Sequence, residues 1–106
     1  MTRGSEIKRV VNQGKRLRTR FFEVRILASP LVHPRVGFVI PKYSYTAVRR
    51  NLLKRRLREI VRVELLATLP AIDVVIKSQP AAYAVAAEFI ARDLRQIVSE
   101  IPRQFP

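Results

Sequence analysis

Residues 37–62 read GFVIPKYSYTAVRRNLLKRRLREIVR, a short apolar run followed by a loop and a long, strongly basic segment. The apolar run fits a strand, which Pro41 ends. Thr46 is a good helix N-cap, and the apolar spacing after it predicts a helix over residues 46–66. A strand that leads through a loop into a basic helix is therefore the organising feature of the chain.

The predicted helix has one basic face and two apolar arcs. At about 100° per residue, five of its polar side chains share an arc of about 100°. They are Asn51, Lys54, Arg55, Arg58 and Arg62. The first apolar arc holds Leu53, Leu57, Ile60 and Val61, and the second holds Val48, Leu52, Val63 and Leu66. The two arcs together are wide enough to face a sheet, so we expect the basic face to point outward.

Local energetics oppose this concentration of positive charge. The basic face contains no acidic residue, and like charges at i,i+4 spacing destabilise a helix. Arg49 and Arg50 lie in the first turn, where the helix dipole disfavours cations. An external polyanion explains the arrangement better than solvent does, and Asn51 adds an amide that can contact a ribose hydroxyl or a base edge.

The composition of the whole chain also indicates a nucleic acid as the partner. Its 106 residues carry a net charge of +13, and residues 1–62 hold 17 basic and 3 acidic side chains. Arg outnumbers Lys by 16 to 5, which suits bidentate contacts with phosphate. There is no cysteine, no secretion signal and no apolar run long enough to span a membrane, so we expect a protein of the cytoplasm without membrane association.

Apolar spacing and turn residues predict the other elements. They are a helix over residues 5–13, a half-buried strand over 20–27, a second strand over 35–40, an inner strand over 71–77 and a helix from Ala81 to the end. The proline-containing turn between the first two strands predicts a hairpin. The result is an α+β fold of order αββαβα, in which helices cover a mixed sheet and residues 1–106 form a single domain, with DNA and RNA both open as its ligand.

The basic segment resembles the signature of the bacterial ribonuclease P protein component. Its pattern Arg-Asn-x-x-Lys-Arg-x-x-Arg is matched by Arg50, Asn51, Lys54, Arg55 and Arg58. Leu52 stands where the family usually has Arg, and its place on an apolar arc predicts that it packs. The resemblance covers nearly the whole chain in order and length, and it implies a fold like domain 2 of ribosomal protein S5, with a left-handed crossover.

The resemblance also implies a function. In this family the protein joins a catalytic RNA, and the complex cleaves precursor tRNA to give the mature 5′ end. The RNA and its Mg²⁺ carry the chemistry, while the protein binds that RNA and guides the 5′ leader through a cleft between the first helix and the sheet. We expect no obligate protein partner. Our candidates for RNA binding are Arg49, Arg50, Asn51, Lys54, Arg55, Arg58 and Arg62, and those for the leader cleft are Arg9, Phe22, Lys42 and Tyr43.

No catalytic or metal-ligating residue is predicted in the protein itself. The single histidine, His33, falls in a predicted turn without an acid or base partner in sequence, and the carboxylates are scattered. We therefore expect no cofactor on protein side chains and Mg²⁺ with the RNA. Two alternatives stay open on the residues alone: a basic ribosomal or ribosome-assembly protein, and a DNA-binding protein, although a helix-turn-helix partner for the basic helix is lacking.

Overall fold

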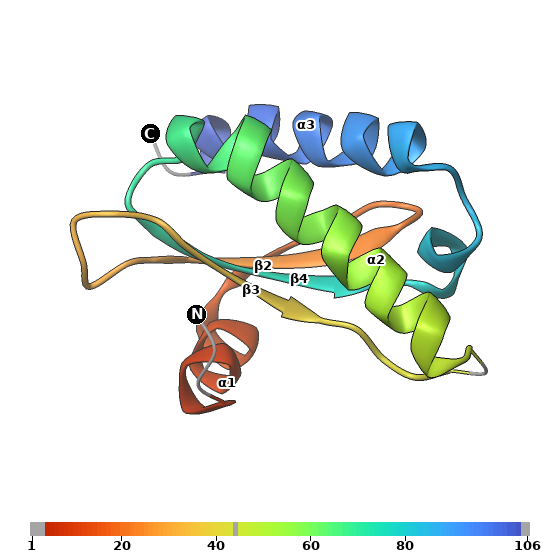
Figure 1. The fold of residues 1–106 in the computed structure, drawn as a ribbon. Coiled ribbons are helices and arrows are strands. Elements are labelled where there is room, and N and C mark those ends of the chain that lie inside the picture. Colours follow the sequence, from red (N-terminus) through yellow and green to blue (C-terminus); the bar gives the residue numbers. More distant parts are fainter. Residues whose placement is uncertain (1–3, 44, 105–106) are drawn as a thin grey trace.

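The computed structural model describes residues 4–43 and 45–104. Its helices and strands are α1 (Gly4–Gln13), β1 (Lys15–Arg18), β2 (Phe22–Ala28), β3 (Arg35–Val39), α2 (Ala47–Ile60), β4 (Ile72–Ser78) and α3 (Ala87–Gln104). Figure 1 shows three layers, with the sheet in the middle, α2 and α3 on one face and α1 on the other. The predicted α+β class with a mixed sheet covered by helices is confirmed.

One strand of the sheet was not predicted. The basic stretch after α1 forms β1, which pairs antiparallel with β2 and places Leu17 opposite Val24. With one apolar residue in four, β1 has no hydrophobic alternation to reveal it. It is an edge strand held by its hydrogen bonds to β2 rather than by a buried face of its own.

The predicted hairpin between β2 and β3 is wrong. The strand order is β1-β2-β4-β3, with β2 antiparallel and β3 parallel to β4. The expectation that residues 71–77 form an inner strand is confirmed, and it explains the order, because β4 is buried along nearly its whole length. A strand whose two faces are both buried is most stable between two neighbours and under helices on both sides.

The hydrophobic core lies between the sheet and the pair α2 and α3. Phe22, Val24 and Ile26 alternate onto this face of β2 and are fully buried. From β4, Val74 and Ile76 lie opposite Ile26 and Val24 in the register and join the same cluster. The opposite face of the sheet carries polar side chains and lies toward α1.

The helix α2 begins as predicted, since the Thr46 hydroxyl accepts a hydrogen bond from the backbone N–H of Arg49. After Ile60 the chain continues as a π-helical turn over Val61–Leu65 and a 3-10 turn over Leu66–Thr68. The predicted span 46–66 is therefore helical, although not α-helical throughout.

Only the first of the two apolar arcs of α2 packs against the sheet. Leu57 has no exposed surface, whereas Val48 and Leu52 of the second arc are 78% and 44% exposed, and Val63 and Leu66 are exposed as well. The expectation that both arcs face the sheet, and that Leu52 packs, is wrong. A helix touches a sheet along one stripe, and α3 diverges from the N-terminal half of α2 (Figure 1), so it leaves this part of the second arc uncovered.

The last helix starts later than predicted. A 3-10 turn over Pro80–Tyr83 follows β4, and α3 begins at Ala87 instead of Ala81. Four of the apolar side chains that recur at helical spacing are buried, namely Ile90, Leu94, Ile97 and Ile101, whereas Ala86 and Ala87 near the start of the helix are exposed. None of the helices in the described residues is both long enough and apolar enough to cross a membrane.

Gly14 makes the close turn between α1 and β1. Its backbone N–H donates to Val10 O at 2.7 Å, and a Cβ at this position would lie 2.5 Å from Val10 O and 3.0 Å from Ile26 O. Both atoms belong to the backbone, so neither can move without shifting α1 or β2.

We therefore expect Gly14→Ala to lower the free energy of unfolding by about 1–3 kcal/mol, as overpacking does elsewhere. Chemical denaturation measures this change. Gly4→Ala is the matched control, because a Cβ there meets nothing within 4 Å, and it should leave the stability nearly unchanged. Equal effects of the two substitutions would contradict the steric argument.

Candidate nucleic-acid interface

The basic side of α2 points into solvent, as predicted. Its members, which we call the α2 basic face, are all exposed: Asn51, Lys54, Arg55, Arg58 and Arg62. Arg62 donates to Glu59 at 2.8 Å. Lys54, Arg55 and Arg58 have no carboxylate partner within residues 4–43 and 45–104, and so their charge is not neutralised by the fold.

The two arginines of the first turn are directed at backbone carbonyls. Arg49 donates from Nη1 to Tyr83 O at 3.4 Å, and Arg50 donates from Nη2 to Ile40 O at 3.3 Å. These carbonyl dipoles offset the unfavourable position of a cation at a helix N-terminus. Each side chain thus ties the start of α2 to a neighbouring segment while keeping its charge.

A hollow lies between the start of α2 and the end of β3. Phe38 and Ile40 form its apolar part, and Arg50, Asn51 and Lys54 form its polar part. Among the described residues, the Nε of Arg50 is buried and has no hydrogen-bond partner. The hollow therefore offers an apolar surface beside an unsatisfied donor, which is a suitable place for a flat polar group.

Three tyrosines fix the loop that leads into α2. The rings of Tyr45 and Tyr83 are stacked with centroids 4.5 Å apart, and Tyr43 meets Tyr83 edge-on at 5.7 Å. The Tyr83 hydroxyl donates to Pro41 O, and the Tyr43 hydroxyl donates to Ser78 O at 3.1 Å. Tyr43 has a φ of 44°, which is an unfavourable backbone conformation for a residue with a side chain. The ring contacts and hydrogen bonds stabilise the loop in this conformation.

Two of the four predicted leader-cleft residues belong to this loop. Lys42 is exposed, and Tyr43 is 43% exposed despite its contacts. Both lie beyond the end of β3, at the start of the path into α2. Their side chains are accessible to a ligand that crosses from the sheet to the basic helix.

A groove runs between α1 and the sheet. Val11 forms its helical wall, and the strands contribute Glu23 and Arg25 from β2, Val39 from β3, and Val75 and Lys77 from β4. Arg25 donates from Nη2 to Glu23 at 3.1 Å, and its Nε is buried without a partner in the described part of the chain. The groove thus combines three valines with two cations and one carboxylate, which pairs with Arg25, and one donor is left unsatisfied.

The sequence contained part of the signal for this groove. The alternation of β2 places Glu23 and Arg25 on the face opposite Val24, yet it does not say that α1 covers that face. Val75 and Lys77 join them only because β4 lies beside β2, which the predicted hairpin excluded. Hence none of the strand residues of the groove was named as a candidate.

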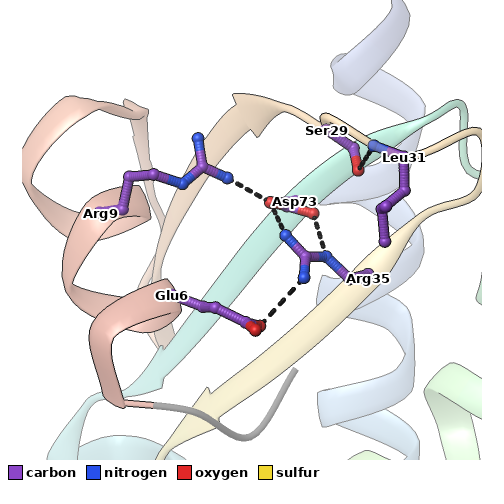
Figure 2. A network of polar contacts seen from close by, with 6 residues as sticks. All are labelled: Glu6, Arg9, Ser29, Leu31, Arg35 and Asp73. Atoms are coloured by element: carbon purple, nitrogen blue, oxygen red, sulfur yellow. Dashed lines mark hydrogen bonds and ion pairs between the residues drawn. The ribbon is translucent and has the colours of Figure 1, made fainter.

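At one end of this face, a polar network joins α1 to the sheet (Figure 2). Asp73 on β4 has no exposed surface. It accepts two hydrogen bonds from Arg35 on β3, at 2.9 and 2.7 Å, and one from Arg9 on α1, at 2.5 Å. Arg35 also donates to Glu6 on α1 at 3.0 Å. Arg9, predicted to line the leader cleft, therefore has its guanidinium engaged by a buried carboxylate.

The charges of this network balance, with two arginines against two carboxylates. Burial alone would raise the pKa of Asp73, but the hydrogen bonds and charge of Arg35, with help from Ser29 and Arg9, hold that pKa below its ordinary value. The carboxyl is therefore ionised at neutral pH. The network is a structural link rather than a free cationic surface.

The prediction that Phe22 lines the cleft is wrong. Its side chain has no exposed surface and lies in the core beneath α2 and α3, on the opposite face of the sheet from the groove. The alternation along β2 that buries Phe22 together with Val24 and Ile26 also turns it away from α1.

No metal or catalytic cluster emerges from the described residues. No group of three or more His, Asp or Glu side chains there could hold a metal ion. His33 is exposed, in the turn before β3. The chemistry that this arrangement supports is the binding of phosphates and of extended, single-stranded polar chains.

Comparisons with known proteins point to one family. A family model described as ribonuclease P matches residues 1–102. The ribonuclease P protein component of Syntrophobacter fumaroxidans is 34% identical over 93 residues, covering 87% of this chain and 78% of that protein. The same component from a Nocardioides species is 37% identical over 103 residues, covering 92% and 86%.

Solved structures agree in fold. A structure of the Staphylococcus aureus RNase P protein has a TM-score of 0.86 at 24% identity and covers all of this chain and 96% of that one. The Thermotoga maritima RNase P protein has a TM-score of 0.79 at 24% identity, with 88% of each chain covered. The three layers and the strand order therefore recur in proteins with little sequence in common with this one.

Proposed function

The chain belongs to the ribonuclease P protein family, and on that premise we propose that its α2 basic face binds the catalytic RNA while the groove under α1 holds the 5′ leader of precursor tRNA. The protein is the protein subunit of an endoribonuclease, and its RNA partner is ribonuclease P RNA. The family match favours this role over a ribosomal or ribosome-assembly protein. We propose that the complex works in the cytoplasm.

One observation carries the assignment of the RNA-binding face. Lys54, Arg55 and Arg58 lie within two turns, all exposed, and none has an acidic partner in the described residues. Such a row repels itself in the free protein and is stabilised when phosphates displace its counterions. The α2 basic face therefore fits an RNA backbone better than it fits water.

The start of α2 suits a more specific contact. Arg50 has a buried Nε without an acceptor in the described part of the chain, and Asn51 beside it offers both a donor and an acceptor. A phosphate would suit the charge of the Arg50 guanidinium, and a ribose hydroxyl or base edge the amide of Asn51. The apolar surface of Phe38 in the same hollow can support a base. We assign this hollow to the RNA partner, as part of the same interface.

The groove suits a leader that is bound through its sugar–phosphate backbone rather than through its bases. Its described lining contains no aromatic side chain, so bases entering it find Val11, Val39 and Val75 rather than a stacking platform. Arg25 and Lys77 supply the charge for the sugar–phosphate chain. We therefore propose that the groove holds single-stranded RNA with little preference for base sequence, whereas aromatic stacking, at about 1–3 kcal/mol per base, would make the contact stronger.

We assign the hydrolysis itself to the RNA and its Mg²⁺ ions. The role of this chain is to neutralise phosphates and to hold the leader in the groove. Reconstitution tests the proposal as a whole: added to a bacterial ribonuclease P RNA at low Mg²⁺, the protein should accelerate cleavage of precursor tRNA. An absence of enhancement would refute it, and enrichment of ribosomal RNA among copurifying RNAs would favour the ribosomal alternative.

The groove can be tested separately from the helix. Arg25→Gln with Lys77→Gln should weaken the binding of precursor tRNA to the reconstituted complex by about tenfold, because two phosphate contacts are lost. Binding of tRNA without a leader should not change. The measurement is the dissociation constant of each RNA, taken with protein saturating the catalytic RNA.

The matched control removes two cations from the other side of the molecule. Arg92→Gln with Arg95→Gln lowers the net charge equally, but both side chains project from α3, away from the groove. If this control weakened leader binding as much as the groove variant, the effect would be one of net charge, and the groove assignment would be wrong.

A further inference from the structure

The carboxylate of Asp73 lies in an unusual place for an RNA-binding protein. It is fully buried on the α1 side of β4, on the same face as Val75 and Lys77 of the groove floor. A buried carboxylate is unfavourable unless it is paired, and an acid close to a polyanion is unfavourable as well. Asp73 is paired with Arg35 and Arg9, so the question is what this pairing holds in place.

The pairing holds α1 against the sheet. Val10 is the one fully buried side chain of this helix in the described residues, so the apolar anchor of α1 is small. The polar network supplies further contacts that attach α1 to the sheet. Glu6 and Arg9 lie three residues apart, on one side of α1, and reach Arg35 and Asp73 on two neighbouring strands (Figure 2).

This attachment also sets the width of the groove. Val11, the groove wall, is two residues from Arg9, and Val75, on the groove floor, is two residues from Asp73. The close turn at Gly14 holds the C-terminal end of α1 against β2. The bond of 2.5 Å between Arg9 and Asp73 adds a second attachment, which ties α1 to β4 beside the groove.

We propose that Asp73 is a positioning residue for the 5′ leader, which acts by holding α1 at the distance from the sheet that a single RNA strand requires. This inference rests on the proposed function of the groove. Asp73 is buried and cannot itself contact RNA. Through α1 it nevertheless helps the protein to distinguish substrates that have a leader from those that do not.

The charge balance of the network gives the proposal a distinctive signature. Asp73→Asn leaves two arginines against one carboxylate, so the substitution adds net positive charge close to the groove. General attraction for RNA should therefore be retained or increased, while selectivity for the leader falls. A variant that merely lost a cation would instead bind all RNA more weakly.

The experiment uses the protein reconstituted with ribonuclease P RNA. Dissociation constants are measured for precursor tRNA with a long leader and with a single-nucleotide leader, and their ratio is the leader selectivity. For Asp73→Asn we expect this ratio to fall by about tenfold, equivalent to the loss of one charge-assisted contact, with unchanged affinity for the catalytic RNA. Asp93→Asn is the control, because that carboxylate accepts from Thr19 at 2.6 Å on the α3 side and does not touch α1.

A second variant separates placement from folding. Asp73→Leu with Arg35→Met replaces the ion pair by apolar side chains, which commonly preserves stability, but it leaves Arg9 and Glu6 of α1 without their partners on the sheet. It should fold and still lack leader selectivity, and hydrogen exchange should show that the α1 amides lose protection relative to the unmodified protein while those of β4 keep theirs.

The outcomes distinguish this inference from the proposed function beneath it. If the unmodified complex does not distinguish the two substrates, the groove is not the leader site. If it does, and Asp73→Asn or the folded double variant keeps the full ratio, then Asp73 does not position α1 for the leader and the inference is wrong.

Discussion

Replacing Lys54, Arg55 and Arg58 together by Gln is expected to weaken the binding of ribonuclease P RNA by about a hundredfold or more at about 0.1 M salt. Each of these side chains is exposed and lacks a carboxylate partner within the described residues, so each is available to a phosphate. At roughly 0.7 to 0.9 per lost phosphate contact, the slope of log affinity against log salt should decrease by about 2 to 3.

Titrations of labelled RNA at several salt concentrations measure this slope directly. Arg92→Gln with Arg95→Gln again serves as the control for net charge, and it should change the slope by far less per charge removed. A slope that stays the same in the triple variant would place the RNA-binding face elsewhere on the protein.

A comparably large effect on stability is expected for Leu57→Ala. This side chain has no exposed surface and anchors α2 to the sheet, so its removal should lower the free energy of unfolding by about 2–5 kcal/mol. The matched control lies on the same helix: Leu52 is 44% exposed, and Leu52→Ala should cost less than about 1 kcal/mol.

Urea denaturation of the two variants measures the difference. Because Leu and Ala have similar helix propensities, the comparison isolates burial from helix formation. Equal losses at the two positions would mean that the second apolar arc is covered in the folded protein, contrary to the exposure of Val48 and Leu52 described above.

The basic helix was the most predictable part of this molecule. Its cap at Thr46, its apolar stripe through Leu53 and Leu57 and its cationic face all follow from spacing within a single element. Nothing outside the helix had to be known to place Lys54 or Arg58 in solvent. The second arc was misjudged because the number of faces that a helix buries depends on its neighbours.

Dependence on neighbouring elements also explains why the groove and the polar network could not be predicted from the sequence. Arg9 and Asp73 are separated by 64 positions in the sequence and meet only because α1 packs on the sheet beside β4. The position of β4 between β2 and β3 is a property of the whole sheet, and local turn residues favoured a hairpin instead. Likewise, β1 carries no hydrophobic alternation that could reveal it in the sequence. Its pairing with β2 holds it in the sheet.

The strand order has a consequence for the biosynthesis of the chain. β4 is the partner of both β2 and β3, yet it is the last strand to be made, after the entire basic helix. Until residue 78 has left the ribosome, β2 and β3 have no common neighbour, and the sheet must close through contacts that are distant in sequence, which fold slowly. During that interval the ribosome presents an incompletely folded polycation to its own ribosomal RNA. With α2 binding ribonuclease P RNA as proposed, early capture by that RNA would compete with this non-specific association.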